Sequence, residues 1–335
     1  MPFLSANSFH GLIKETTRGT LPATGTPFYL PIDSPAVTPQ QVFLRDSAFR
    51  GSPVETYDMV QGVRHDELDA KYPLYADTFP NLLAAVLGSA DTVTGTGPYV
   101  HTIGLLNAPA SGSQPPSYSL LGFDGANYFT LSGAQAASLN LQFSSEQTAD
   151  ATVKWIGNPY VSYTAAPAPF ATTSFSTEAL VPGWSVGVTV GGVSFAYIAS
   201  GEIMLDRKTK PIFTEGAQGP YVNFAGPLTV TGKFTGLVNT NADPWSTGAT
   251  ATALNRSPQT VVVTFTDPND QTVAVNHSIA FTMTAAQFEK PKRTVSKEYT
   301  EIEVEFEARA NATDAITGYA PVKTVTTNGT VTAYN

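Results

Sequence analysis

The stretch from Glu301 to Arg309 reads Glu-Ile-Glu-Val-Glu-Phe-Glu-Ala-Arg, an uninterrupted alternation of acidic and apolar residues. Successive side chains of a β-strand point to opposite faces, so the alternation predicts a strand with one buried and one wet face. Like charges on one face repel each other. Either the row belongs to an ordinary solvent-exposed strand of an acidic protein, or it faces something that must be kept negative. The row consists of Glu301, Glu303, Glu305 and Glu307.

Composition predicts a mainly β fold. Only 13% of the residues are charged, and 27 Gly and 25 Pro are spread among Thr-, Ser-, Val- and Ala-rich stretches, as in many short strands joined by turns. The 335 residues suffice for one large all-β domain or two smaller ones. A net charge of −9 argues against nonspecific attraction to nucleic acids or anionic membranes.

Cysteine usage and hydropathy exclude several classes. The absence of Cys excludes disulfides, thiolate metal sites and a thiol nucleophile. The first residues lack a basic region followed by an apolar core, and no apolar run approaches the roughly 20 residues that span a bilayer as a helix. We therefore expect a soluble protein with no membrane partner.

The chain divides into four segments. Residues 1–24 contain closely spaced Gly and Pro and are expected to form an irregular N-terminal arm. Residues 25–162 hold a first series of predicted strands. A Pro/Ala-rich connector opens the second series, residues 163–309. Residues 310–335 are Thr-rich and are expected to form an extended C-terminal arm without a core of its own.

One short helix is expected near residues 78–87. Asp77 or Thr78 can cap it, Pro80 fits its first turn, and Gly88 supplies a C-terminal stop. Its apolar residues share one stripe, so we expect it to cover an open face or end of a sheet.

The search for catalytic and metal-binding motifs indicates no enzyme and no cofactor. Gly226–Lys233 contains a Gly-Lys pair, but Phe234 stands where a phosphate loop needs Ser or Thr, so a strand is the better interpretation. Asp267, Asn269 and Asp270 offer calcium ligands, but a plain hairpin turn explains them better. The histidines lie far apart, which argues against a zinc site; they are His10, His65, His101 and His277.

Basic residues gather in two clusters, Arg207, Lys208 and Lys210, and Lys290, Lys292, Arg293 and Lys297. Neither cluster has the interleaved aromatic residues of a nucleic-acid surface. They are either charged loop tips or contacts with acidic surfaces of identical neighbouring subunits, and we favour the second interpretation.

Several segments, in order, resemble tail tube (major tail) proteins of long-tailed, non-contractile bacteriophages (siphoviruses). Leu12–Ile32 resembles their N-terminal arm and first strand, and Phe43–Ser52 their second segment. Tyr75–Gly88 is similar to their helix, and Pro116–Gly125 and Gly133–Phe143 to the strands after it. The resemblance covers the first half of the chain; in the second half only the order of elements agrees.

The resemblance implies a β-sandwich or barrel subunit with a flanking short helix and extended N- and C-terminal arms. Such subunits form stacked rings, with arms and a long hairpin reaching into the adjacent ring, and genome DNA passes without sequence-specific binding. The implied partners are further copies of the chain, a tape measure protein, and tail tip and terminator proteins. The implied location is the virion tail tube, assembled in the host bacterial cytoplasm.

The sequence leaves two alternatives for the symmetry of the ring. Leu131–Gly157 and Ile198–Gly236 share a loose order of elements, which leaves open a duplicated subunit in a trimeric ring. We favour a hexamer, because the helix has no counterpart after Ala165.

Within this framework, we expect the four glutamates to contribute to a lumen that repels DNA. We also expect that removal of either arm leaves a folded monomer that no longer polymerises. The alternative is a monomeric or small-oligomer β-sandwich that binds carbohydrate or acts as an adhesive module, with Tyr160, Tyr163 and Trp184 stacking on sugars.

Overall fold

The computed structural model describes residues 8–170, 175–176, 178–195, 197–237, 257–268 and 276–334. Within these residues the protein is mainly β with one α-helix, which confirms the predicted fold class. The strands form one extensively connected antiparallel system and a separate small hairpin.

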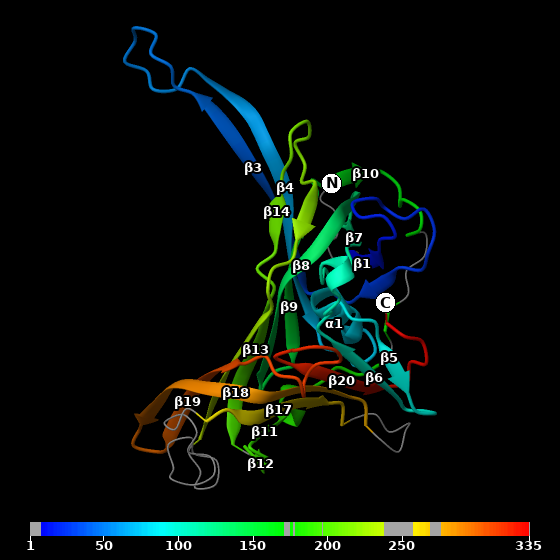
Figure 1. Ribbon diagram of the computed structural model, residues 1–335, viewed down its shortest axis with the longest axis vertical. Helices are drawn as coiled ribbons and strands as arrows, with labels where there is room; N and C mark the ends of the chain where they lie inside the picture. The colour runs from blue at the N-terminus through cyan, green and yellow to red at the C-terminus, as the bar shows by residue number, and fades with distance from the viewer. Residues whose placement is uncertain are drawn as a thin grey trace.

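The main sheet is a run of long antiparallel strands. Its first half pairs in the order β3 (Ser34–Asp46), β4 (Asp58–Pro73), β9 (Asp150–Gly157) and β8 (Tyr128–Ser144). Its second half continues with β13 (Ile198–Asp206), β16 (Thr229–Leu237), β19 (Thr300–Ala308) and β18 (Ser278–Val295). β8–β9 and β13–β16 are therefore adjacent antiparallel pairs, and duplication of the two halves stays a prediction. β3, β4, β8 and β9 stand upright in Figure 1, whereas β18 and β19 lie crosswise at its lower end.

Strand β18 belongs to two sheets. Its second half pairs with β19, whereas its first half lies between β17 (Gln259–Thr266) and β20 (Lys323–Asn328). From β17 this second sheet continues to β11 (Gly187–Val190) and β12 (Val193–Ser194), and from β20 to β6 (Tyr99–Gly104) and β5 (Thr92–Thr94). Figure 1 shows these strands crossing the lower end of the main sheet.

Strand β8 also bridges two sheets. Its first residues pair with β7 (Tyr118–Phe123) and β10 (Val161–Tyr163), and β7 leads to β1 (Phe9–Lys14) and β2 (Phe28–Leu30). A small hairpin of β14 (Lys210–Ile212) and β15 (Val222–Phe224) forms a separate two-stranded sheet. Short 3-10 turns occur at Pro109–Ser111 and Gly183–Ser185.

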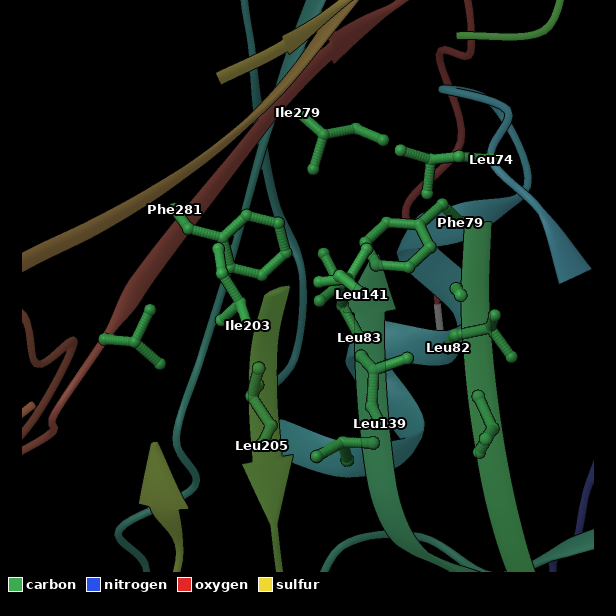
Figure 2. Packing of buried hydrophobic residues seen from close by; sticks show 14 of the residues in the cluster. Leu74, Phe79, Leu82, Leu83, Leu139, Leu141, Ile203, Leu205, Ile279 and Phe281 are labelled. Carbon is green, nitrogen blue, oxygen red and sulfur yellow. The ribbon is translucent and has the colours of Figure 1, made fainter. Parts of the chain in front are cut away.

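The helix α1 (Phe79–Leu87) is buried along its whole length. Figure 2 shows its Phe79, Leu82 and Leu83 against Leu139 and Leu141 of β8, Ile203 and Leu205 of β13, and Ile279 and Phe281 of β18. An isolated helix this short would be marginal in water, so packing between the sheets stabilises it.

The ends of α1 agree with the sequence in part. Gly88 has φ 85°, its N–H donates to the Ala84 carbonyl, and a Cβ there would lie 2.9 Å from the Pro115 Cα, so only glycine fits. Thr78 is the N-cap residue, but its side chain makes no capping hydrogen bond. The cap is weaker than the sequence indicates.

The β3–β4 hairpin extends away from the body of the protein, at the upper left of Figure 1. Near its base, the guanidinium of Arg64 donates to the buried Asp66 carboxylate at 2.8 and 2.9 Å, and the Tyr160 N–H donates to the same carboxylate at 2.9 Å. The far half carries exposed apolar residues, among which Phe49 is fully exposed.

The two chain ends differ from the sequence prediction. Residues 1–24 are not irregular throughout, because β1 pairs on both sides and Leu12 is fully buried. Residues 310–335 are not without a core, because β20 lies between β18 and β6 and Val322 is fully buried. This pairing argues against the expectation that removing either segment leaves a folded monomer, since each removal would open a sheet. The domain boundaries themselves stay a prediction.

The sequence pattern concealed β20 because its alternating residues are small and polar. Thr324 and Thr326 are almost fully buried, and the Thr324 hydroxyl donates to the Ile103 carbonyl at 2.5 Å. A buried hydroxyl costs little once it is hydrogen-bonded. The Thr-rich composition that suggested an unpacked arm belongs to an interior strand.

Candidate functional site

The alternation along β19 is confirmed in space. Ile302, Val304 and Phe306 are at most 2% exposed and belong to the main core, whereas the glutamates alternate with them on the open face of the sheet. Phe306 packs against Phe234 with ring centroids 5.3 Å apart and against Phe288 at 5.7 Å. The aromatic packing fixes the rotation of β19 and with it the direction of the acidic row.

The acidic row on β19 is part of a wider acidic surface that crosses the strands. In register, Glu305 lies opposite Lys233 of β16 on one side and Glu289 of β18 on the other. Lys233 in turn lies opposite Glu202 of β13. Across six strands this line reads Asp150, Gln142, Glu202, Lys233, Glu305 and Glu289.

We call this surface the acidic face: the open side of β9, β8, β13, β16, β19 and β18. Sequence reasoning found only the row along β19 and missed Asp150, Glu202 and Glu289. No local signal marks them, because none belongs to an alternating acidic row in its own strand: Asp150 and Glu289 are the single acids of β9 and β18, and Glu202 shares β13 only with Asp206. Only the pairing brings them together. A hollow of about 320 Å³ on this face is lined in part by Glu202, Glu289, Glu305 and Glu307.

Lys233 reduces the repulsion within the acidic face. Its ammonium donates to Glu303 Oε1 at 3.0 Å. The pKa of Lys233 is raised, first by this hydrogen bond and then by the charges of Glu303, Glu305 and Glu202, outweighing the opposing effect of burial. Lys233 therefore holds several carboxylates at close spacing, and Lys71 of β4 pairs with Asp150 at 2.9 Å at the border of the face, while the face as a whole remains acidic.

The second basic cluster lies on the same hairpin as the glutamates. Lys292 of β18 is the cross-strand partner of Glu303, and Lys292, Arg293 and Lys297 are exposed. Lys290 belongs to β18, but its side chain lies outside the described residues. The cluster thus borders the acidic face. Its contact with another subunit stays a prediction.

The first basic cluster splits in two. Lys208 and Lys210 are exposed, whereas Arg207 is only 3% exposed. Burial lowers the pKa of the Arg207 guanidinium to about 10. Arg207 is therefore not a charged loop tip, and its contact with a neighbouring subunit stays a prediction.

The remaining candidates do not combine into a catalytic or metal site. Within the part of the chain that the structure describes, no three His, Asp or Glu side chains are placed to hold a metal ion. His101 pairs instead with Asp91 at 2.6 Å, and its other ring nitrogen lies 2.8 Å from the Thr330 carbonyl oxygen. Of the candidate calcium ligands, Asn269 and Asp270 lie outside the described residues.

The candidate sugar-stacking aromatics are not gathered in one groove. Tyr160 lines a groove with Phe9, Phe123 and Tyr128, but neither Tyr163 nor Trp184 contributes to it. No helix among the described residues has the length and apolar character needed to cross a bilayer.

Comparison with known families accounts for nearly the whole chain. The model of the phage tail tube protein family matches residues 5–333, so the chain belongs to this family. A search of the curated proteins found no match. Family membership makes the chain a structural tail tube protein located in the virion tail, where it self-assembles into a tube.

Proposed function

We propose that this phage tail tube protein polymerises into stacked rings and that its acidic face lines the lumen through which genome DNA is delivered. The observation that carries the proposal is the acidic face itself: Asp150, Glu202, Glu289 and the β19 glutamates share one open side of a single sheet, with Lys233 enclosed among them.

The electrostatics suit a passive conduit. Lysines and arginines along a lumen would displace the counterions of DNA and bind it, whereas carboxylates leave the counterions in place and repel the polymer. The protein then needs no sequence-specific contact and no catalytic group. We infer a role without enzymatic activity.

Free sheet edges support closure of the sheet across subunits. Among the described residues, β3 pairs only with β4, and β18 beyond Glu289 pairs only with β19. These are the two ends of the main sheet, and unpaired backbone donors and acceptors at such edges template pairing with another chain. Pairing between neighbouring subunits would join the sheets into one barrel and remove the edges.

The β3–β4 hairpin supports contact between successive rings. Phe43, Leu44, Val54 and Val60 are each more than half exposed and share this hairpin with the fully exposed Phe49. Contiguous exposed apolar surface on a protruding segment marks an interaction site. We assign it, together with the basic residues Lys208, Lys210, Lys290, Lys292, Arg293 and Lys297, to subunit contacts.

We further propose six-fold rings, with a trimer of duplicated subunits as the alternative. The other expected partners are the tape measure protein and the tail tip and terminator proteins of a siphovirus tail, assembled in the host cytoplasm.

Electron microscopy of the purified full-length protein tests polymerisation. We expect hollow tubes or stacked rings; isolated globules across the concentrations and salts tried would contradict the proposal. Tubes of the double variant Glu303→Lys/Glu305→Lys should then co-sediment with short double-stranded DNA at physiological salt, whereas wild-type tubes should not.

A charge-matched control separates the lumen from the outside. Asp124→Lys/Glu215→Lys changes two exposed acids by the same total charge; one lies in the turn between β7 and β8 and the other in the turn between β14 and β15, outside the strands of the acidic face. We expect this control to bind far less DNA than the β19 variant. Equal binding by the two variants would count against a lumenal position for Glu303 and Glu305.

A further inference from the structure

A groove beside the acidic face contains an unusual cation. The groove has a volume of about 640 Å³ and lies where the segments after β6, β13, β15 and β19 meet. Its lining includes Leu105, Leu228, Phe224 and Tyr319 together with Arg207. It adjoins the hollow that Lys233 and the glutamates line on the acidic face, and Glu307 belongs to both linings.

Arg207 is buried without an acidic partner among the described residues. Its one hydrogen bond through the guanidinium runs from an Nη nitrogen to the Ser113 carbonyl oxygen at 3.4 Å, and its Nε has no partner there. Burial lowers its pKa and no opposing charge raises it, so among the described residues no carboxylate lies near enough to offset the loss of hydration. Buried charges in proteins are normally paired, because leaving one unpaired costs several kcal/mol.

The chemistry of the groove selects a carboxylate within an otherwise apolar segment. The planar guanidinium fork matches a carboxylate in two parallel hydrogen bonds. Glu307 and Arg309 are exposed and are the other charged residues of the lining, so the described groove carries a net charge of +1 on a chain whose net charge is −9. An incoming anion is therefore attracted overall, although Glu307 opposes it.

The surroundings have the composition of a protein interface. Phe224 is 44% exposed and Tyr319 is 67% exposed at the groove, an aromatic surface that water would otherwise cover. Aromatic residues with a desolvated arginine are typical of the residues that contribute most to binding between proteins. The protein available in greatest number to a self-assembling tube subunit is another copy of itself.

We propose that the Arg207 groove is a docking site for a carboxylate-bearing segment of a second copy of this chain. In the free subunit, Arg207 is a buried charge without an acidic partner among the described residues; in the assembled tube, the neighbour's Asp or Glu completes the pair. The inference rests on the polymerisation proposed above and assigns one of its contacts.

The variant Arg207→Met tests the site by two measurements, one of the stability of the monomer, which should not fall, and one of tube assembly, which should weaken. Methionine fills a similar volume without the unpaired charge, so the monomer's melting temperature should rise or stay unchanged. The critical concentration for tube assembly should rise at least about tenfold, because the neighbour's carboxylate loses its partner at the interface. The matched control Lys14→Met, which removes an exposed cation outside the groove and outside both basic clusters, should change assembly by less than about threefold.

Chemical cross-linking tests the partner. Arg207→Lys keeps a positive charge and introduces an amine that a zero-length carbodiimide reagent can join to a carboxylate. In tubes assembled from a mixture of isotopically labelled and unlabelled chains, mass spectrometry should find the introduced lysine joined to an Asp or Glu of the other isotopic form.

The outcomes separate this inference from the proposed function. Failure of the wild-type chain to form tubes contradicts the proposed function. Normal tubes from wild type and from Arg207→Met at equal critical concentrations overturn the inference alone. So does a fall in the melting temperature of the Arg207→Met monomer, which would show a structural role, or cross-links of the introduced lysine that are confined to single chains.

Discussion

The two sides of strand β19 are made by alternate residues of one short sequence, yet they have different roles. On the inner side, Ile302, Val304 and Phe306 are almost fully buried and join an aromatic cluster. On the outer side, glutamates at the same spacing form a repulsive row that is partly offset by Lys233 and by Lys292, the cross-strand partner of Glu303. Apolar burial on one side can stabilise the fold strongly enough to carry unfavourable charge on the other.

The difference between the two sides of β19 separates residues that maintain the fold from residues that we assign to function. Residues that pack well explain the fold, whereas the row that local energetics disfavours requires another explanation. Substitutions on the inner side should therefore alter stability, and substitutions on the outer side should alter how the surface treats DNA.

The largest effect is expected for Phe306→Ala on the inner side. Removing a buried aromatic ring from contact with Phe234 and Phe288 should lower the free energy of unfolding by about 3–5 kcal/mol. Urea denaturation of the monomer measures it. The neighbouring Glu307→Ala, on the outer side, should change stability by no more than about 0.5 kcal/mol, and equal losses would contradict the division of roles.

The next effect concerns a buried titratable group, His10 of β1. His10 is fully buried, its Nδ1 lies 3.0 Å from the Tyr72 hydroxyl, and burial lowers its pKa from 6.5 to about 4. The unfolded chain takes up a proton below pH 6.5 while the folded chain does not, so stability is lost as the pH falls from 6.5 towards 4. The loss should reach about 3 kcal/mol.

His10→Gln isolates this contribution. The variant should show a shallower fall in the free energy of unfolding between pH 6.5 and 4 than the wild type, whatever its stability at neutral pH. Parallel pH profiles for the two proteins would show that His10 is not buried in its neutral form.

The fold could be predicted where the pattern is carried by large apolar residues. The strand β19 and the helix α1 occur where the sequence predicts them. Phe306 and Phe79 are almost fully buried, and each element can bury its large aromatic ring in only one orientation. The chain ends could not be predicted this way. β20 alternates buried Thr with half-buried or exposed residues, and β1 contains Gly11, both of which resemble loop sequence until neighbouring strands pair with them.

The candidate site could be predicted along one strand but not across several. Glu202 and Glu289 are isolated acids in the sequence, and only the register of β13, β16, β19 and β18 aligns them. Arg207 differs from Lys208 in burial although the two are adjacent in the sequence, because the groove that receives Arg207 is built from distant segments.

The third prediction concerns the close packing of Gly232 against Phe306 beneath the acidic face. A Cβ at Gly232 would lie 2.3 Å from the Phe306 ring, so Gly232→Ala should lower the free energy of unfolding by about 1–3 kcal/mol. At Gly187 a Cβ would meet nothing within 4 Å, so Gly187→Ala should be neutral or slightly stabilising. Thermal denaturation of both variants distinguishes a clash with the Phe306 ring from a general loss of stability when any glycine is replaced by alanine.

The smallest effect is expected for Lys233→Met on the outer side. Without its cation, Glu303, Glu305 and Glu202 repel one another, so the variant should be slightly less stable than wild type at low salt, and the difference should shrink as salt rises. Denaturation at two salt concentrations measures it. A difference that is independent of salt would indicate lost packing.

A lumenal role for the acidic face depends most on the direction that this face takes in the assembled tube. A reconstruction of tubes of the full-length protein by electron cryomicroscopy, at a resolution that traces β19, tests this directly. We predict that Glu301, Glu303, Glu305 and Glu307 point into the lumen, with the acidic faces of neighbouring subunits joined around it. A reconstruction in which these glutamates lie on the outer wall of the tube would contradict the account.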